Sequence, residues 1–241
     1  MKRLFRWLTL LVLVAIVAML VWSPALQIDT VEYGPSGFIA QSEIQPFFDP
    51  FVGRSWIVTL LQTRFRGTWY QELPAADKIH IGFKGFRTLR VGIQTKKAWI
   101  RIGRTGSPMF AAADGTLLRS VSSDYLPPKA DVLPVVSGIS EDDLMGEKLR
   151  SDQFDIIQTL LKGLDTRFPL QVWSIYLDPA NTIVLQSAEY GSVYLGSRYK
   201  LNEKLDYLKL FLTQISTSPN VTISQIDLRA AKRVIVSYAA H

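Results

Sequence analysis

Residues 79–93 have the sequence IHIGFKGFRTLRVGI, which predicts two β-strands joined by a turn near Gly85. Apolar and polar residues alternate over 79–83 and again over 89–93, as expected for strands with one buried face. His80 falls between two isoleucines, so we expect its side chain to face solvent as an ordinary surface residue. The stretch therefore predicts an antiparallel pair with one face that other elements must cover.

The residues before this pair predict one strand and two short helices. Residues 26–33 contain the apolar alternation of a strand. Ser42 and Gln45 have the spacing of a capping box, so the first helix is expected to begin at Ser42. Residues 56–70 carry apolar side chains at helical spacing and predict the second helix. The order β-α-α-β-β predicts a small α+β unit over residues 26–104.

A long apolar stretch precedes this unit. Residues 7–28 contain no charged residue, and at about 1.5 Å per residue they can reach roughly 33 Å, enough for a hydrocarbon core of roughly 30 Å. The stretch predicts a single transmembrane helix over residues 7–25, with residues 1–6 as a short cytoplasmic tail. The residues expected to anchor this helix are Lys2, Arg3, Arg6, Trp7 and Trp22.

The charge on the N-terminal tail predicts the location of the chain. Basic residues before the helix favour a cytoplasmic N-terminus. The predicted location is the cell (inner) membrane, in a single pass, with the bulk of the chain periplasmic or extracytoplasmic. A cleaved signal peptide is the alternative, because Ser23-Pro24-Ala25 contains the small residues of a cleavage site.

Residues 105–241 predict a second, mixed β-rich domain. Asp114-Gly115 lies between two short apolar segments and is the strongest hairpin signal in the chain. Apolar stripes over 154–164 and 201–215 predict two amphipathic helices. Further strands are expected at 172–177, 182–185, 193–195, 221–228 and 234–238.

The composition argues against most catalytic chemistry. The 241 residues contain no cysteine and only two histidines, His80 and His241, which excludes thiolate nucleophiles and cysteine metal sites. The sequence has no phosphate-binding glycine loop and no nucleophile elbow. We therefore expect a protein that is not an enzyme, with no catalytic residue, no metal, no cofactor and no small-molecule substrate.

Positive charge is the other feature of the composition. The net charge is +6, but three of the basic residues stand ahead of the apolar stretch, so the exported part has an ordinary balance and nucleic acid is not an expected partner. Residues 84–104 hold seven basic residues and no acidic one. This run could contact anionic lipid or an acidic partner. The simpler interpretation is that these side chains occupy the solvated faces of strands.

The last predicted strand is the candidate binding element. A terminal strand is expected at a sheet edge, where free amides and carbonyls can accept a strand from a partner. Asp227 and Arg229 precede it with one residue between them, so both can project to the same side, and we predict a structural role for the pair. The alternative is that the strand only completes the sheet. The residues predicted to bind a partner are Arg233, Ile235, Ser237 and Tyr238.

Short segments along most of the chain resemble the FtsQ/DivIB family of bacterial cell-division proteins. The resemblance implies one membrane anchor, a POTRA domain over residues 26–104 and a β domain over residues 105–241. The segments that carry it are Ile28-Asp29-Thr30-Val31-Glu32, Ser42-Glu43-Ile44, residues 89–93, Ala113-Asp114-Gly115, Leu133-Pro134-Val135, Glu203-Lys204-Leu205 and Ile226-Asp227-Leu228-Arg229.

The resemblance also implies a function. A member of this family would be a non-catalytic scaffold that recruits FtsB/FtsL-type coiled-coil partners and other divisome members at the septum and influences septal peptidoglycan synthesis. The family's coiled-coil partner binds near the end of the β domain, which favours partner binding by the last strand.

Two other functional classes remain open. A membrane-anchored envelope hydrolase using carboxylates would need two titratable groups that converge in a pocket. A POTRA-bearing assembly or secretion factor would usually carry repeated POTRA units or a β-barrel after them, and the sequence shows neither.

Overall fold

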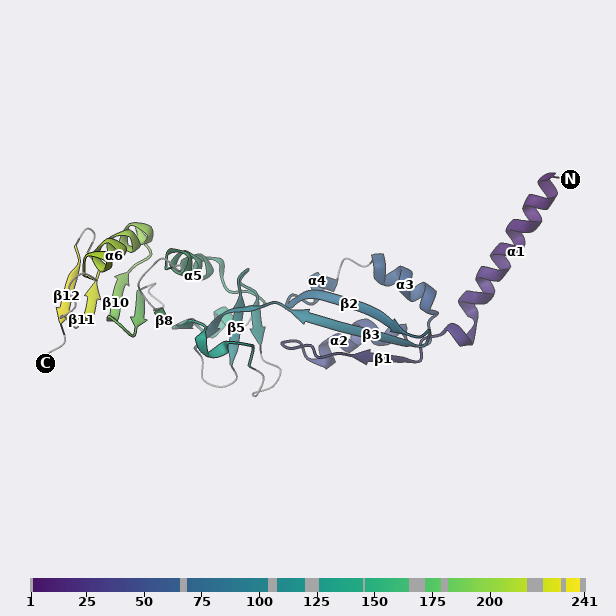
Figure 1. Cartoon of the computed structure of the whole chain (residues 1–241), viewed down its shortest axis with the longest axis horizontal. Coiled ribbons are helices and arrows are strands. Elements are labelled where there is room, and N and C mark those ends of the chain that lie inside the picture. The colour runs from purple at the N-terminus through teal and green to yellow at the C-terminus, as the bar shows by residue number, and fades with distance from the viewer. Residues whose placement is uncertain are drawn as a thin grey trace. The chain divides into compact units, whose positions relative to one another are not determined.

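The structure is a computed structural model of the whole chain (Figure 1). It describes residues 2–65, 69–103, 108–119, 126–144, 146–164, 172–178, 182–215, 223–230 and 233–238. The chain divides into two compact units, Met1–Lys96 and Lys97–His241. The fold is α+β, as predicted.

The boundary between the units differs from the predicted one after residue 104. β4 (Ala98–Ile102) pairs with β5 (Met109–Ala112) and, in parallel, with β7 (Val135–Ser137). Because both partners belong to the second unit, β4 belongs there as well.

From residue 30 on, the first unit has the predicted order of elements, with an additional short α-helix and a 3-10 turn at Asp49–Phe51. Its sheet has the order β1-β3-β2, in which β1 is parallel to β3 and β2 is antiparallel to β3. The elements are β1 (Thr30–Tyr33), α2 (Gln41–Phe48), α3 (Trp56–Phe65), α4 (Trp69–Glu72), β2 (Ala76–Lys84) and β3 (Thr88–Thr95). Phe48 and Trp69 lie in its core with their ring centroids 5.0 Å apart.

The predicted capping box is wrong. α2 begins at Gln41 after Ala40, and no side chain caps it. Ser42 therefore lies inside the helix. The chain enters the helix through a turn in which the Ser36 hydroxyl donates to the carbonyl oxygen of Ile39, 2.6 Å away. This turn sets the start of the helix without a capping side chain.

The predicted transmembrane helix is also wrong. α1 (Lys2–Trp22) forms, but among the described residues no helix is both long enough and apolar enough to cross a bilayer. The helix includes the basic residues at its start and gives way to a 3-10 turn (Pro24–Leu26) at its end. Its uncharged part begins at Trp7 and reaches about 24 Å at about 1.5 Å per residue, less than the roughly 30 Å of the hydrocarbon core. The predicted location as a single-pass cell-membrane protein is contradicted by the same finding.

The second unit is built on one mixed sheet. Within the described residues the strand order is β12-β11-β10-β9-β8-β7-β4-β5-β6. The elements not yet given are β6 (Leu117–Arg119), α5 (Ser151–Gly163), β8 (Val172–Leu177), β9 (Ile183–Ser187), β10 (Gly191–Gly196), α6 (Leu201–Ile215), β11 (Ile223–Asp227) and β12 (Ile235–Tyr238), with short 3-10 turns at Ala130–Val132 and Asp142–Leu144. The predicted Asp114-Gly115 hairpin joins β5 to β6, and Gly115 takes a positive φ of 81°.

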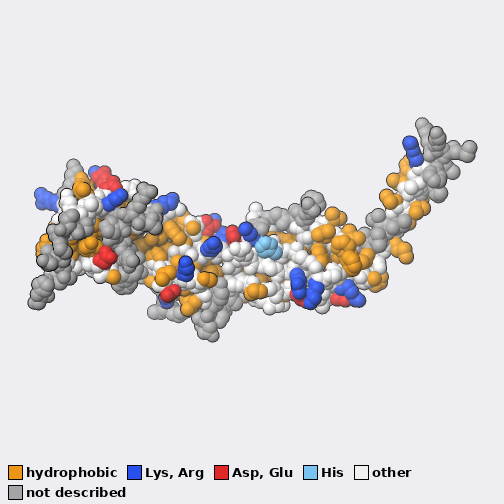
Figure 2. Space-filling view, viewed as in Figure 1, with side chains coloured by type: hydrophobic (Ala, Val, Ile, Leu, Met, Phe, Trp, Pro, Cys, Tyr) orange, Lys and Arg blue, Asp and Glu red, His pale blue; other side chains and the backbone are white. Residues whose placement is uncertain are grey.

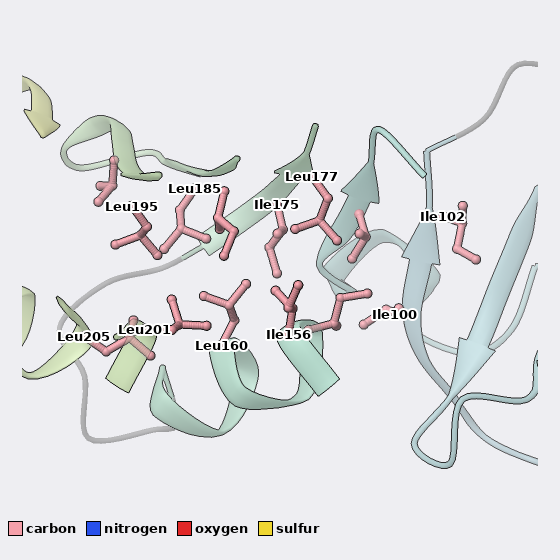
Figure 3. Packing of buried hydrophobic residues seen from close by; sticks show 14 of the residues in the cluster. Ile100, Ile102, Ile156, Leu160, Ile175, Leu177, Leu185, Leu195, Leu201 and Leu205 are labelled. Atoms are coloured by element: carbon pink, nitrogen blue, oxygen red, sulfur yellow. The ribbon is translucent and has the colours of Figure 1, made fainter. Parts of the chain in front are cut away.

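The two amphipathic helices cover one face of this sheet. Figure 3 shows Ile175 and Leu185 of the sheet opposite Leu160 of α5, and all three side chains are fully buried. Because side chains alternate along a strand, the residues between these core positions lie on the opposite face of the sheet.

Candidate partner-binding edge

β12 occupies one end of the nine-stranded sheet. It pairs antiparallel with β11, with Asp227 opposite Ile235 and Gln225 opposite Ser237. Among the described strands, none pairs with its outer side. Half of its backbone amides and carbonyls therefore point away from the sheet, which is the arrangement that accepts an added strand.

The side chains of β12 divide between the core and the surface. Val234 and Val236 pack against the hydrophobic core. Ile235 is 58% exposed and Tyr238 is 63% exposed. Arg233 and Ser237 are exposed as well, so all four residues predicted to bind a partner lie at the surface. Val234 and Val236 hold the strand on the core, and Ile235, which lies between them, faces solvent.

The Asp227–Arg229 pair lies at the turn that leaves β11. The Arg229 guanidinium donates to both carboxylate oxygens of Asp227, with Nε 3.0 Å from Oδ1 and Nη2 2.6 Å from Oδ2, and the backbone amide of Arg229 donates to Oδ1 at 2.9 Å. The hydrogen bond from Arg229 lowers the pKa of Asp227. The Arg229 guanidinium carbon also lies 5.5 Å from the ring centroid of Tyr194. The pair therefore stabilises the turn after β11 by hydrogen bonds within it, and Arg229 also contacts β10 through Tyr194.

Removal of this carboxylate is expected to cost stability and to spare binding. An Asp227→Ala protein loses the bonds that hold the turn, and since Arg229 is largely exposed the loss is expected to be about 1 kcal/mol, or roughly 2–4 °C in melting temperature. Thermal unfolding measures this, with Asp206→Ala on the exposed face of α6 as the control. A protein with unchanged melting temperature and no partner binding would contradict the structural role.

Lys204 is a buried lysine that the sequence patterns did not single out for chemistry. Its residue is only 6% exposed, and burial lowers the pKa of its amine. Its Nζ donates to the carbonyl oxygens of Leu195 at 2.7 Å and Ser197 at 2.9 Å, which lie at the end of β10 and just beyond it. The amine therefore links α6 to the end of β10 by hydrogen bonds. Its position could have been noticed, because residue 204 falls on the apolar stripe of that helix.

A hollow beside α5 brings carboxylates together with the basic side chains of Arg198 and Lys200. A cavity of about 570 Å³ is lined by Asp152 and Asp155 of α5 and by Glu203 of α6. Hydrogen bonds from Arg150 hold the pKa of Asp152 down to about 2, so this carboxyl is ionised at neutral pH and has no proton to donate. Although three carboxylates line the cavity, no three acidic or histidine side chains among the described residues are grouped so that they could hold a metal ion.

The basic run over residues 84–104 is partly neutralised within the first unit. Lys84 and Arg90 both contact Glu32, with nitrogen–oxygen distances of 3.5 and 2.9 Å. Arg87 forms an ion pair with Asp29. The acidic partners come from β1 and the residue before it, so the charges of Lys84, Arg87 and Arg90 are compensated on the folded surface while the run as a whole stays basic.

The remaining predicted residues do not converge on a site. His80 is exposed on β2, as expected, and His241 lies outside the described residues. Arg6 is exposed and Trp7 is 71% exposed on α1. Lys2, Arg3 and Trp22 lie in that helix, but their side chains fall outside the described part. In the first unit hydrophobic side chains gather over α3 (Figure 2), where Leu60 and Leu61 are exposed.

Comparison with known proteins provides no relative. No protein-family model matches the chain, and no curated protein matches it.

Proposed function

We propose that this protein is a non-catalytic scaffold that recruits a partner by adding a strand to β12. The observation that carries the proposal is the edge position of β12 together with the exposure of Ile235 and Tyr238. Backbone pairing at such an edge supplies affinity, and exposed side chains on the edge supply specificity. Tyrosine is enriched among the residues that dominate binding energy, which makes Tyr238 the expected anchor.

The partner class rests on the resemblance to the FtsQ/DivIB family. We infer an FtsB/FtsL-type coiled-coil protein of the bacterial division machinery as the partner, with other divisome members assembled around it and an influence on septal peptidoglycan synthesis. Two observations are compatible with this inference: the order β1-α2-α3-α4-β2-β3 in the first unit, which is the β-α-α-β-β order of a POTRA domain with one more short α-helix, and the terminal strand at the edge of the second.

The structure offers less support for a hydrolase that uses carboxylates. A carboxylic acid that protonates a leaving group needs a raised pKa. Asp152, in the cavity beside α5, has a lowered one because Arg150 is bound to it. Two bonds of 2.7 Å join that carboxylate to the guanidinium, which fixes it as a structural ion pair.

The proposal predicts that Tyr238→Ala weakens partner capture. Loss of a central aromatic anchor is expected to reduce affinity at least tenfold, as measured by pull-down of an FtsB-type protein with purified full-length chain. Tyr199→Ala is the matched control, because Tyr199 is 69% exposed but lies on the loop before α6. Equal capture by wild type and Tyr238→Ala would remove Tyr238 from the interface.

A further inference from the structure

A buried ammonium group without a counter-ion lies in the first turn of α6. Lys204 is only 6% exposed, and its amine donates to two backbone carbonyl oxygens, 2.7 and 2.9 Å away. Among the described residues no carboxylate forms an ion pair with this amine, and burial alone lowers its pKa. Because lysine is rarely buried unless its charge is paired, the position of Lys204 indicates a place for an anion.

The amine of Lys204 faces a small cavity. An ammonium group has three N–H donors, and the two carbonyl oxygens use two of them. Lys204 lines a cavity of about 80 Å³ together with Ser197, whose carbonyl oxygen is one of the two acceptors. Leu201 and Leu205, its apolar neighbours on α6, belong to the hydrophobic core (Figure 3) and do not line the cavity. The end of Lys204 that reaches the cavity is therefore the amine.

Two further cations line the same cavity, and each already has a carboxylate partner. Lys200 Nζ lies 3.2 Å from Glu203 Oε2, and Arg229 Nη2 lies 2.6 Å from Asp227 Oδ2. Nε and Nη2 of Arg229 bind Asp227, so Nη1 keeps its donors for another acceptor. When these two pairs are counted, one positive charge remains at the cavity, and it is that of Lys204.

The charge and size of the cavity restrict what can bind. One negative charge neutralises the site, whereas a dianion would leave an excess of negative charge beside Glu203. A volume of 80 Å³ corresponds to two or three water molecules at about 30 Å³ each. It is far below the roughly 300 Å³ at which pockets for larger organic ligands begin. These two limits favour a single carboxylate group, whose two oxygens can each accept a charge-assisted hydrogen bond.

We propose that this cavity binds one carboxylate group, which pairs with the ammonium of Lys204. Lys200 adds a second cation at the exposed side of the cavity, and Nη1 of Arg229 adds further donors. The pairing is strong because Lys204 is held away from water, where charges attract one another more than they do in solvent. The carboxylate belongs either to a small free acid or to an acidic side chain of another polypeptide, and both sources present the same chemistry.

Titration of the full chain with sodium acetate tests the site. Sodium chloride keeps the ionic strength constant, so that general screening does not change. Wild type is expected to show a saturable change in the NMR signals of Lys204 and Tyr207, which both line the cavity, with a dissociation constant on the order of 10 mM or lower. Lys204→Met retains the buried stem without the charge and is expected to bind at least tenfold more weakly. Lys200→Gln should bind at least threefold more weakly, and Lys209→Met, on the exposed face of α6, should bind like wild type.

A second ligand distinguishes the two sources of the carboxylate. N-acetylglutamate N-methylamide has a blocked main chain and one side-chain carboxylate. Binding of both ligands supports a site for an acidic side chain, and binding of acetate alone supports a site for a free acid.

Two results would overturn the proposal: no saturable change in wild type with acetate, and equal acetate affinity in Lys204→Met and Lys209→Met. If Lys204→Met does not fold, Lys200→Gln decides, and an unchanged affinity in that variant refutes the site. Strand addition at β12 uses none of these side chains, so this proposal and the proposed function can fail separately.

Discussion

A proline placed in β12 is expected to abolish partner capture, by at least a hundredfold in affinity, while the rest of the protein stays folded. Strand addition depends on backbone hydrogen bonds, and proline lacks the amide hydrogen that one of these bonds requires. The same substitution inside a central strand would unfold the sheet. In an edge strand, a proline at a residue whose amide points outward removes no hydrogen bond within the sheet. It removes only a hydrogen bond that an added strand would accept.

Two neighbouring proline variants test this prediction specifically. Successive amides of an edge strand point alternately toward β11 and away from it, so one of Ile235→Pro and Val236→Pro removes an inward bond and the other removes an outward one. The outward variant should keep the wild-type melting temperature and lose the FtsB-type partner. The inward variant should lose stability first. If both variants fold like wild type and still capture the partner, the interface lies elsewhere.

Loss of the buried amine of Lys204 is expected to be the most destabilising polar change in the second unit. Lys204→Ala removes two hydrogen bonds from a charged donor, leaves the carbonyls of Leu195 and Ser197 without that donor, and deletes a buried stem. Hydrogen bonds to charged groups contribute about 1.5–3 kcal/mol, so with the lost packing we expect a decrease of about 3 kcal/mol in the free energy of unfolding.

Urea denaturation separates the two contributions. Lys204→Met retains most of the buried stem and loses only the donors, so its decrease should be smaller than that of the alanine variant. Lys209→Met, on the exposed face of the same helix, should leave the midpoint unchanged. A Lys204→Met protein as stable as wild type would show that the hydrogen bonds of the amine between α6 and β10 do not contribute to stability.

Periodicity in the sequence was sufficient for the elements with one buried face. The alternation in residues 79–93 predicted β2 and β3, and the stripe in residues 201–215 predicted α6 with its bounds. Asp114-Gly115 predicted its hairpin because a positive φ at Gly115 is readily adopted only by glycine. In each case a local physical preference agrees with the tertiary packing.

One error arose from contacts distant in sequence and two from the local path of the chain at a helix end. The first unit was predicted to extend to residue 104, but residues 98–102 form β4, whose partner β7 lies more than thirty residues further along the chain. The helix expected to begin at Ser42 starts earlier because a preceding turn directs the chain. The transmembrane helix was predicted over residues 7–25, although the α-helix ends at Trp22.

The role of Lys204 was missed because it depends on tertiary contacts rather than on a motif. Lys204 occupies a core position of α6, but the carbonyl oxygens that compensate its charge belong to the end of β10 and the residues after it. No local pattern shows which backbone groups will face a side chain from another element.

Depletion of the protein in the organism that carries it, followed by microscopy, tests the scaffold function most directly. The account predicts filamentous cells without septa, rescued by wild type and by Tyr199→Ala but not by the folded proline variant of β12. Normal division after depletion would contradict the proposed function, and full rescue by that proline variant would contradict the role of the β12 edge.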